Sequence, residues 1–267
     1  MMTASQAHAE PLLRDGWRRR VAHAFNRAAP HYTERANAQQ VMGSALWSRL
    51  PGQAERVLDL GCGPGHWTAR LSRRYATIAL GVDLAPGMLT QAHRRHGDHA
   101  RWLCADAACL PLAPRSQDLV FSNLAIQWCP DQAAVMHELY RILTPGGRAL
   151  INTLGPGTLA EVDYAWSRPG RPASVLDFLA PETLRRFAHQ AGFRNVRLDA
   201  APERFFYPDL AAVMNSIKGV GAQLAPNRPR APLTRNDLAR AAQRFETLRE
   251  GHGLPVTYQR LTLTLSR

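Results

Sequence analysis

The feature that most constrains the fold of this chain is a glycine-rich loop that directly follows a short apolar run. The run covers residues 56–60, and the loop reads Asp59-Leu60-Gly61-Cys62-Gly63-Pro64-Gly65. Glycines at such a turn let the backbone approach a bound ligand closely, and a helix predicted over 66–74 presents its positive end there. The segment therefore predicts a strand, a ligand-binding loop and a helix in succession.

Beyond the loop, short apolar runs alternate with amphipathic ones. Further strands are predicted over 77–83, 101–105, 117–123, 148–154, 195–200 and 256–265. Helices are predicted over 87–96, 131–143 and 181–191, where apolar residues recur at helical spacing. This alternation predicts the α/β class, with a Rossmann-like, doubly wound, seven-stranded mixed sheet whose last strand is antiparallel.

Two parts of the chain depart from the alternation. Residues 1–55 are predicted as an N-terminal helical cap over the ligand site, helical mainly over 18–29 and 36–50, and residues 56–267 as the main domain. Residues 203–253 are predicted as an irregular, partly helical insertion that faces the substrate. The segment 155–172 is rich in glycine and proline, which predicts a long loop, and Pro145-Gly146-Gly147 is predicted to end a helix.

Composition limits the class of protein. The 267 residues, 45% of them hydrophobic, suffice for one large domain with a buried core. No stretch approaches the roughly 20 apolar residues of a membrane helix. The first residues also lack the apolar core of a secretory signal, so a cytoplasmic protein is expected. The cysteines form no CxxC pair and the histidines no paired metal spacing, so reduced thiols and no metal site are expected.

The net charge of +12 has two interpretations. It fits an anionic macromolecular partner, and it equally fits a composition that uses arginine throughout. Because Lys218 is the only lysine and the arginines are scattered in short clusters, charge alone leaves both open.

Acidic residues at the ends of predicted strands favour S-adenosylmethionine (SAM) as the ligand of the loop. The carboxylate of Asp59 would repel a pyrophosphate but could organise the amino end of a methionine, and the glycine spacing is tighter than in dinucleotide sites. Asp83 could accept both ribose hydroxyls, or could instead cap a helix. Asp106 could accept the adenine amino group, with the Ala107 amide meeting a ring nitrogen.

Apolar residues complete the predicted cofactor site. Leu84 and Met88 could sandwich the adenine, although a methionine at helical spacing is more often part of a core. The full predicted cofactor set is Asp59, Gly61, Gly63, Gly65, Asp83, Leu84, Met88, Asp106, Ala107 and Asn123.

The end of the fourth predicted strand weighs against one class of acceptor. It reads Phe121-Ser122-Asn123-Leu124-Ala125-Ile126-Gln127-Trp128. Nucleobase amino-methyltransferases usually carry Asn/Asp-Pro-Pro-Tyr/Phe at this place, so methylation of a base is not expected, and no nucleic acid partner is predicted.

Several segments resemble the malonyl-acyl-carrier protein O-methyltransferase family of biotin synthesis. The similarity runs from about residue 18 to the end of the chain, and the glycine loop contributes little to it because many SAM enzymes share that loop. The discriminating segments are Phe25-Asn26-Arg27-Ala28-Ala29-Pro30-His31-Tyr32, Gln127-Trp128 and Ser216-Ile217-Lys218-Gly219-Val220-Gly221-Ala222.

The resemblance implies methylation of the free carboxylate of malonyl-acyl-carrier protein, or of malonyl-CoA, with SAM as cofactor. A malonyl carboxylate is ionised at pH 7 and needs no general base, so alignment and water exclusion can supply most of the acceleration. Tyr32 is predicted as a donor or gate for the acceptor, although it could simply pack the cap. Lys218 is the second predicted acceptor residue, and otherwise a surface lysine.

The partner of such an enzyme would be an acidic carrier protein, whose approach a positive surface would speed. Arg204, Arg228 and Arg230 are candidates for that contact because they lie in the predicted insertion. No membrane partner is predicted, and the oligomeric state stays open. The alternatives are a SAM-dependent O- or N-methyltransferase of another small molecule, and a SAM- or RNA-binding module without turnover.

Overall fold

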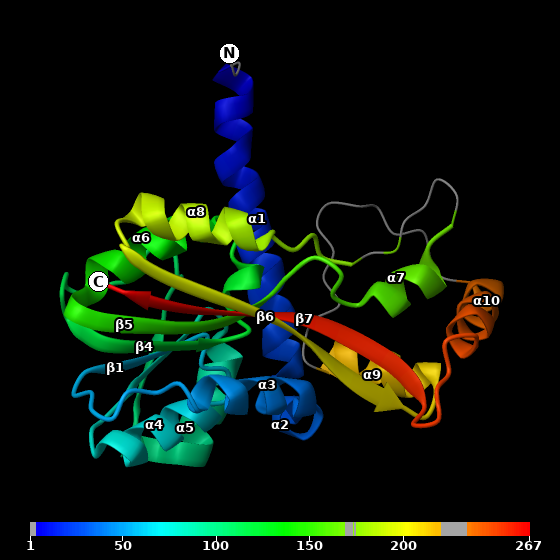
Figure 1. Cartoon of the computed structure of the whole chain (residues 1–267), viewed down its shortest axis with the longest axis horizontal. Helices are drawn as coiled ribbons and strands as arrows, with labels where there is room; N and C mark the ends of the chain where they lie inside the picture. The colour runs from blue at the N-terminus through cyan, green and yellow to red at the C-terminus, as the bar shows by residue number, and fades with distance from the viewer. Residues whose placement is uncertain (1–3, 169–172, 174, 220–233) are drawn as a thin grey trace.

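A computed structural model describes residues 4–168, 173, 175–219 and 234–267, and its core is one seven-stranded sheet. The strand order is β3-β2-β1-β4-β5-β7-β6 (Figure 1). The first five strands pair in parallel, while β7 lies antiparallel between β5 and β6, so the predicted fold class and the predicted antiparallel last strand are confirmed. The strands are β1 (Val57–Leu60), β2 (Leu80–Asp83), β3 (Arg101–Cys104), β4 (Gln117–Asn123), β5 (Leu143–Leu154), β6 (Asn195–Tyr207) and β7 (Leu254–Ser266).

Helices cover both faces of the sheet, as the doubly wound prediction requires. On one side lie α3 (Asn37–Trp47), α4 (His66–Tyr75) and α5 (Pro86–His96), and on the other α6 (Gln132–Ile142) and α8 (Pro181–Ala191) (Figure 1). The amphipathic helices α6 and α8 bury their apolar residues against the sheet. Asp131 begins α6 by accepting a hydrogen bond from the Ala134 amide, which explains why this helix starts where it does.

A long helix and a second apolar cluster lie beside this sandwich. Helix α1 (Ala4–Ala28) rises past the sheet and leads into the short α2 (Tyr32–Arg35). The long strands β6 and β7 continue beyond the other strands, where α7 (Ala160–Trp166), α9 (Leu210–Gly219) and α10 (Arg235–Glu246) gather around them (Figure 1). Val213, Phe245 and Val256 are fully buried in the cluster formed there.

Three local predictions differ from the structure. Helix α7 lies inside 155–172, where a loop was predicted, because Leu159, Val162 and Ala165 recur at helical spacing and are buried. Strand β5 begins at Leu143 rather than at 148, and its pairing with β4 is irregular near its start. Strand β6 continues to Tyr207, so the predicted insertion begins with a paired strand. The division of the chain at residues 55 and 56 stays a prediction.

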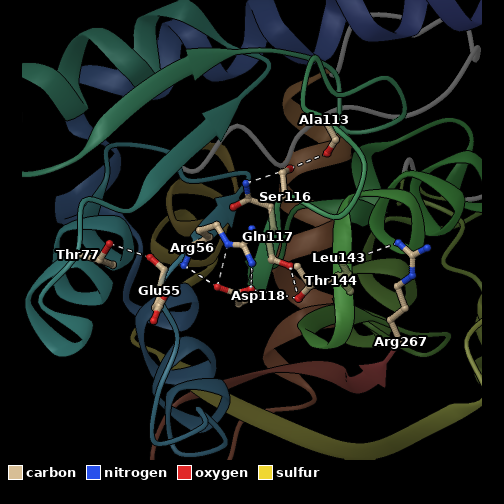
Figure 2. A network of polar contacts seen from close by, with 10 residues as sticks. All are labelled: Glu55, Arg56, Thr77, Ala113, Ser116, Gln117, Asp118, Leu143, Thr144 and Arg267. Atoms are coloured by element: carbon tan, nitrogen blue, oxygen red, sulfur yellow. Dashed lines mark hydrogen bonds and ion pairs between the residues drawn. The ribbon is translucent and has the colours of Figure 1, made fainter.

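The two edges of the sheet differ in chemistry. At the amino ends of the parallel strands, the Arg56 guanidinium donates hydrogen bonds to both carboxylate oxygens of Asp118, and the Thr144 hydroxyl donates to the same carboxylate (Figure 2). Arg267 donates to the Leu143 carbonyl at the same edge. These contacts tie β1, β4 and β5 to the last residue of the chain. They are internally satisfied, which leaves the carboxyl ends of the strands as the place for a ligand.

Candidate functional site

The glycine loop is held against β2 by backbone hydrogen bonds. The amides of Gly61 and Cys62 both donate to the Val82 carbonyl, at 2.7 and 3.0 Å. Gly61, Gly63 and Gly65 have φ angles of +74°, +52° and +82°, a region that favours glycine. A Cβ at Gly61 would lie 2.1 Å from the Ala125 Cβ, whereas a Cβ at Gly63 would meet only a Tyr32 ring carbon at 3.9 Å. The backbone at Gly63 is therefore open to a ligand.

Asp83 fixes the loop from the end of β2. Its Oδ2 accepts a hydrogen bond from the Gly63 amide at 2.9 Å, and its Oδ1 accepts one from the Ala85 amide at 2.8 Å. Burial raises the pKa of this carboxyl, and the two amides act in the opposite direction. Asp83 thus holds the turn before α5 but does not cap the helix, whose N-cap residue is Ala85, and it lines the cavity below.

Asp59 lies beneath the loop rather than in the cavity. It is 2% exposed and accepts a 2.6 Å hydrogen bond from the Thr68 hydroxyl of α4. Burial and, to a lesser extent, the charge of Asp83 raise its pKa to about 7, against the opposing effect of the hydrogen bond from Thr68. A cationic ligand nearby would favour the ionised form of this carboxyl.

The third acidic residue, Asp106, has a partner that the sequence did not indicate. Its Oδ1 accepts from the Ala108 amide at 2.9 Å, and its Oδ2 lies 2.7 Å from Nε of Arg18 on α1. Cys129 lies half-buried close to this pair, and desolvation, followed by the charge of Asp106, raises the pKa of its thiol to about 12, so it stays neutral. Arg18 therefore links helix α1 to Asp106, the residue predicted to accept a hydrogen bond from the adenine amino group.

One cavity at the carboxyl ends of the strands brings most predicted site residues together. Its volume is about 800 Å³, with the space open to solvent included, and small-molecule sites commonly have about 300–1,000 Å³. The predicted residues that line it are Tyr32, Gly61, Gly63, Asp83, Leu84, Met88, Asp106, Ala107 and Asn123. Met88 is also buried in a small apolar cluster with Ala29 and Ala85, as its core interpretation requires, and its contact with the adenine stays a prediction.

Helix α1 and Tyr32 close one side of the cavity. Val21, Ala22 and Phe25 of α1 line it, and the Phe25 ring meets Trp128 edge-on at 5.4 Å. Tyr32 begins α2, and burial, followed by the charge of Asp83, raises the pKa of its phenol well above the usual range. The phenol is therefore a hydrogen-bond donor at neutral pH, and its hydroxyl bonds to no described residue.

Polar contacts behind the cavity fix the end of β4. The Asn123 amide nitrogen donates to the Gln39 carbonyl of α3 at 2.9 Å, and its oxygen accepts from Asn152 at 3.1 Å. Asn152 also donates to the Met42 carbonyl and accepts from Thr262. Both polar atoms of Asn123 are thus engaged with the scaffold, and its place in the cofactor set stays a prediction.

Some predicted residues lie outside the cavity. Besides Asp59, Gly65 does not line it. Gly65 packs against the Trp102 ring, which a Cβ at this position would approach to 2.5 Å. Lys218 is exposed near the end of α9 and does not line it either. Arg204 is paired with Glu250, and Arg228 and Arg230 lie outside the described residues. The structure therefore gives Lys218 no contact with the site it was predicted to serve.

Sequence reasoning missed two groups of lining residues. Residues 124–126 and 128–130 follow β4, and Leu124 takes a φ of +57°, a strained backbone of the kind found at functional turns. The α1 residues Arg18, Val21, Ala22 and Phe25 form the second group. The sequence predicted a helical cap over the ligand site, and the apolar side of α1 at Trp17, Val21 and Ala24 is typical of a buried face, but neither signal indicates which side chains line the cavity.

The donor set fits SAM and disfavours a dinucleotide. Among the described residues, Arg18 is the only cationic side chain that lines the cavity, and it already faces Asp106. Carboxyls with raised pKa values at Asp59 and Asp83 would be stabilised by a cationic ligand and would repel a pyrophosphate. SAM carries an ammonium and a sulfonium, while Leu84 and Met88 offer apolar contact to a base.

A methyltransferase domain family matches residues 57–147. The chain is 37% identical to the malonyl-acyl-carrier protein O-methyltransferase of Methylococcus capsulatus, over 86% of each protein. It is 36% identical to the biotin biosynthesis bifunctional protein BioHC of Cellvibrio japonicus, over all of this chain but only 54% of that longer protein.

Solved structures agree on the fold. A SAM-dependent methyltransferase from Mesorhizobium loti matches with a TM-score of 0.53 at 21% identity, over 84% of this chain and 96% of that one. The phosphoethanolamine N-methyltransferase 2 of Haemonchus contortus, solved with SAM, also gives 0.53 at 19% identity, over 86% and 52%. Within the described residues no helix is both long and apolar enough to cross a membrane, and no cluster of metal-binding side chains occurs.

Proposed function

The chain belongs to the malonyl-acyl-carrier protein O-methyltransferase family, and we propose on this premise that it methylates the free carboxylate of malonyl-acyl-carrier protein, using SAM, in biotin synthesis. The observation that carries the proposal is the cavity at the carboxyl ends of the strands, where Asp83 and Asp106 meet the glycine loop under α1. SAM supplies a methyl group activated by its positive sulfur.

The residues of the chain bind and orient rather than transfer protons. A malonyl carboxylate is already ionised at neutral pH, so the reaction requires no general base from the chain. Phe25, Trp128 and the apolar side of α1 exclude water, which strengthens electrostatic interactions inside the cavity. We assign to the Tyr32 hydroxyl the role of positioning the acceptor carboxylate, because it is protonated at neutral pH and bonds to no residue that the structure describes.

We further propose that the carrier-bound thioester is preferred over malonyl-CoA. Both offer the same reacting carboxylate, so the preference would arise from the carrier protein itself. The full chain with SAM should convert malonyl-carrier protein to its methyl ester and release S-adenosylhomocysteine, with a higher kcat/KM than for malonyl-CoA. Product mass and S-adenosylhomocysteine release measure this. Failure with both thioesters, together with turnover of an unrelated acceptor, would refute the function.

We predict that Tyr32→Phe lowers kcat/KM for the malonyl thioester about tenfold to a hundredfold, because a hydrogen bond to a charged group is worth about 1.5–3 kcal/mol. The ring stays in place beside Gly63, so SAM binding, followed by calorimetry, should change less than threefold.

Tyr75→Phe is the matched control for Tyr32. Its hydroxyl donates to the Pro51 carbonyl away from the cavity, so the same chemical change should leave turnover intact. Wild-type turnover by Tyr32→Phe would show that the hydroxyl has no part in positioning the acceptor.

A further inference from the structure

Helix α1 presents two different sides. One side faces the cavity with Val21, Ala22 and Phe25. The outer side carries Arg19, His23 and Arg27 at intervals of four residues, and all three are exposed. Side chains four residues apart lie along one face of a helix, so these three form a basic row on α1.

No carboxylate among the described residues neutralises the arginines of the basic row. Neither Arg19 nor Arg27 forms an ion pair within the described part of the chain, and the neighbouring Asp15 is engaged by Arg18. Other exposed arginines do have internal partners, as the pair of Arg56 with Asp118 illustrates. The row is thus available to an external anionic partner.

The basic row lies close to the cavity, on the opposite side of α1. A helix with its side chains is about 10–12 Å across, so the row lies only one helix diameter from the cavity that α1 walls. A folded carrier protein is far too large for a cavity of about 800 Å³. It must stay on the rim while its flexible phosphopantetheine arm carries the malonyl group inward.

We propose that the basic row Arg19, His23 and Arg27 docks the acidic carrier protein that delivers the malonyl group, an inference that rests on the proposed function. Charge complementarity is the main argument, since carrier proteins are acidic. A nucleic acid is the less suitable occupant, because its binding calls for a broad basic surface, whereas this row is one helix face flanked by Asp15 and Asn26.

The double variant R19E/R27E tests the proposal. We expect its Kd for malonyl-carrier protein to rise at least tenfold, measured by fluorescence anisotropy on the full chain bound to S-adenosylhomocysteine. The salt dependence of that Kd should weaken, because opposing charges have been removed. S-adenosylhomocysteine affinity and the kcat for malonyl-pantetheine should stay within twofold of the wild type.

R148E/R194E is the matched control, with the same change in net charge. Both arginines are exposed at the edge of the sheet opposite the cavity, where Arg148 and Asn195 pair with Ser266. An equal loss of carrier binding in both double variants would show a general charge effect, and an unchanged Kd in R19E/R27E would place the dock elsewhere; either result overturns the proposal. So would RNA binding that R19E/R27E abolishes while carrier binding persists.

The binding assay separates this proposal from the proposed function. A wild-type chain that binds malonyl-carrier protein through the row but never methylates it would contradict the function and leave the dock standing. If the wild-type chain and the R19E/R27E variant methylated malonyl-carrier protein equally well, that result would contradict the dock alone.

Discussion

Asp83→Asn is expected to weaken SAM binding by about tenfold to a hundredfold, or about 1.4–2.8 kcal/mol. Both carboxylate oxygens accept backbone amides, from Gly63 and from Ala85. Asparagine has the same shape but only one oxygen, so its amino group must face one of those N–H donors. A charge-assisted hydrogen bond worth about 1.5–3 kcal/mol is lost, and the loop that carries Gly63 is released.

Calorimetric titration with SAM and S-adenosylhomocysteine measures the effect of Asp83→Asn. Asp98→Asn is the matched control, because Asp98 is exposed in the short helix Gly97–His99 and does not line the cavity. If Asp83→Asn bound both ligands with wild-type affinity, the proposed role of this carboxylate in cofactor binding would be wrong.

The sheet and the loop could be predicted because local patterns determine them. The apolar runs that became β2 and β4 end at Asp83 and Asn123, and the run that became β1 ends one residue after Asp59, so the sequence already marks these positions. The carboxyl ends of parallel strands meet at one edge, so the joint presence of Asp83, Asp106 and the loop in one cavity followed from topology.

What the sequence could not supply are contacts made by the fold between distant segments. Nothing near Asp106 indicates that Arg18 faces it, since the pair forms only once α1 packs across the sheet edge. The donation from the Trp17 indole to the Trp128 carbonyl likewise joins residues far apart in the chain. The role of Lys218 stays a prediction, because being the only lysine says nothing about position, and the side chain is exposed and does not line the cavity.

Asp59 shows how one residue can satisfy a pattern and still act differently from its prediction. The carboxylate was expected to reach the methionine end of the cofactor. In the fold it is buried under the loop against Thr68, where its raised pKa of about 7 makes it responsive to a cation above it. The residue type was identified from the strand end, but only packing decides whether a side chain lies in a cavity or behind its wall.

The loop glycines should separate folding from binding. In Gly61→Ala the new methyl group would lie 2.1 Å from the Ala125 Cβ, on a backbone with φ of +74°. Overpacking costs about 1–3 kcal/mol and the left-handed backbone roughly 1–2 kcal/mol more. At about 2–4 °C per kcal/mol, we expect Tm to fall by about 5–15 °C, with SAM binding lost.

Gly63→Ala and Gly97→Ala complete the comparison. Both glycines have a φ of +52°, but Gly63 faces the cavity whereas Gly97 faces open space. Both variants should lose stability through backbone strain alone, roughly 1–2 kcal/mol at Gly63 and about 1–3 kcal/mol at Gly97, whose ψ is −132°. Gly63→Ala should in addition bind SAM at least tenfold more weakly, because its methyl group occupies the ligand's approach to the backbone. Wild-type SAM affinity in Gly63→Ala would show that the cofactor does not approach this turn.

The double variant Gly61→Ala/Ala125→Gly provides the strictest test of the steric argument. Removing the Ala125 methyl group leaves its Cα, 3.5 Å from the new Cβ, as the nearest neighbour, which is an ordinary contact. The double variant should therefore recover most of the Tm lost in Gly61→Ala, with only the backbone strain remaining. If Ala125→Gly instead added its own destabilisation to that of Gly61→Ala, the collision would not be the cause. The close approach of the loop to the segment after β4 would then have to be explained by backbone conformation alone.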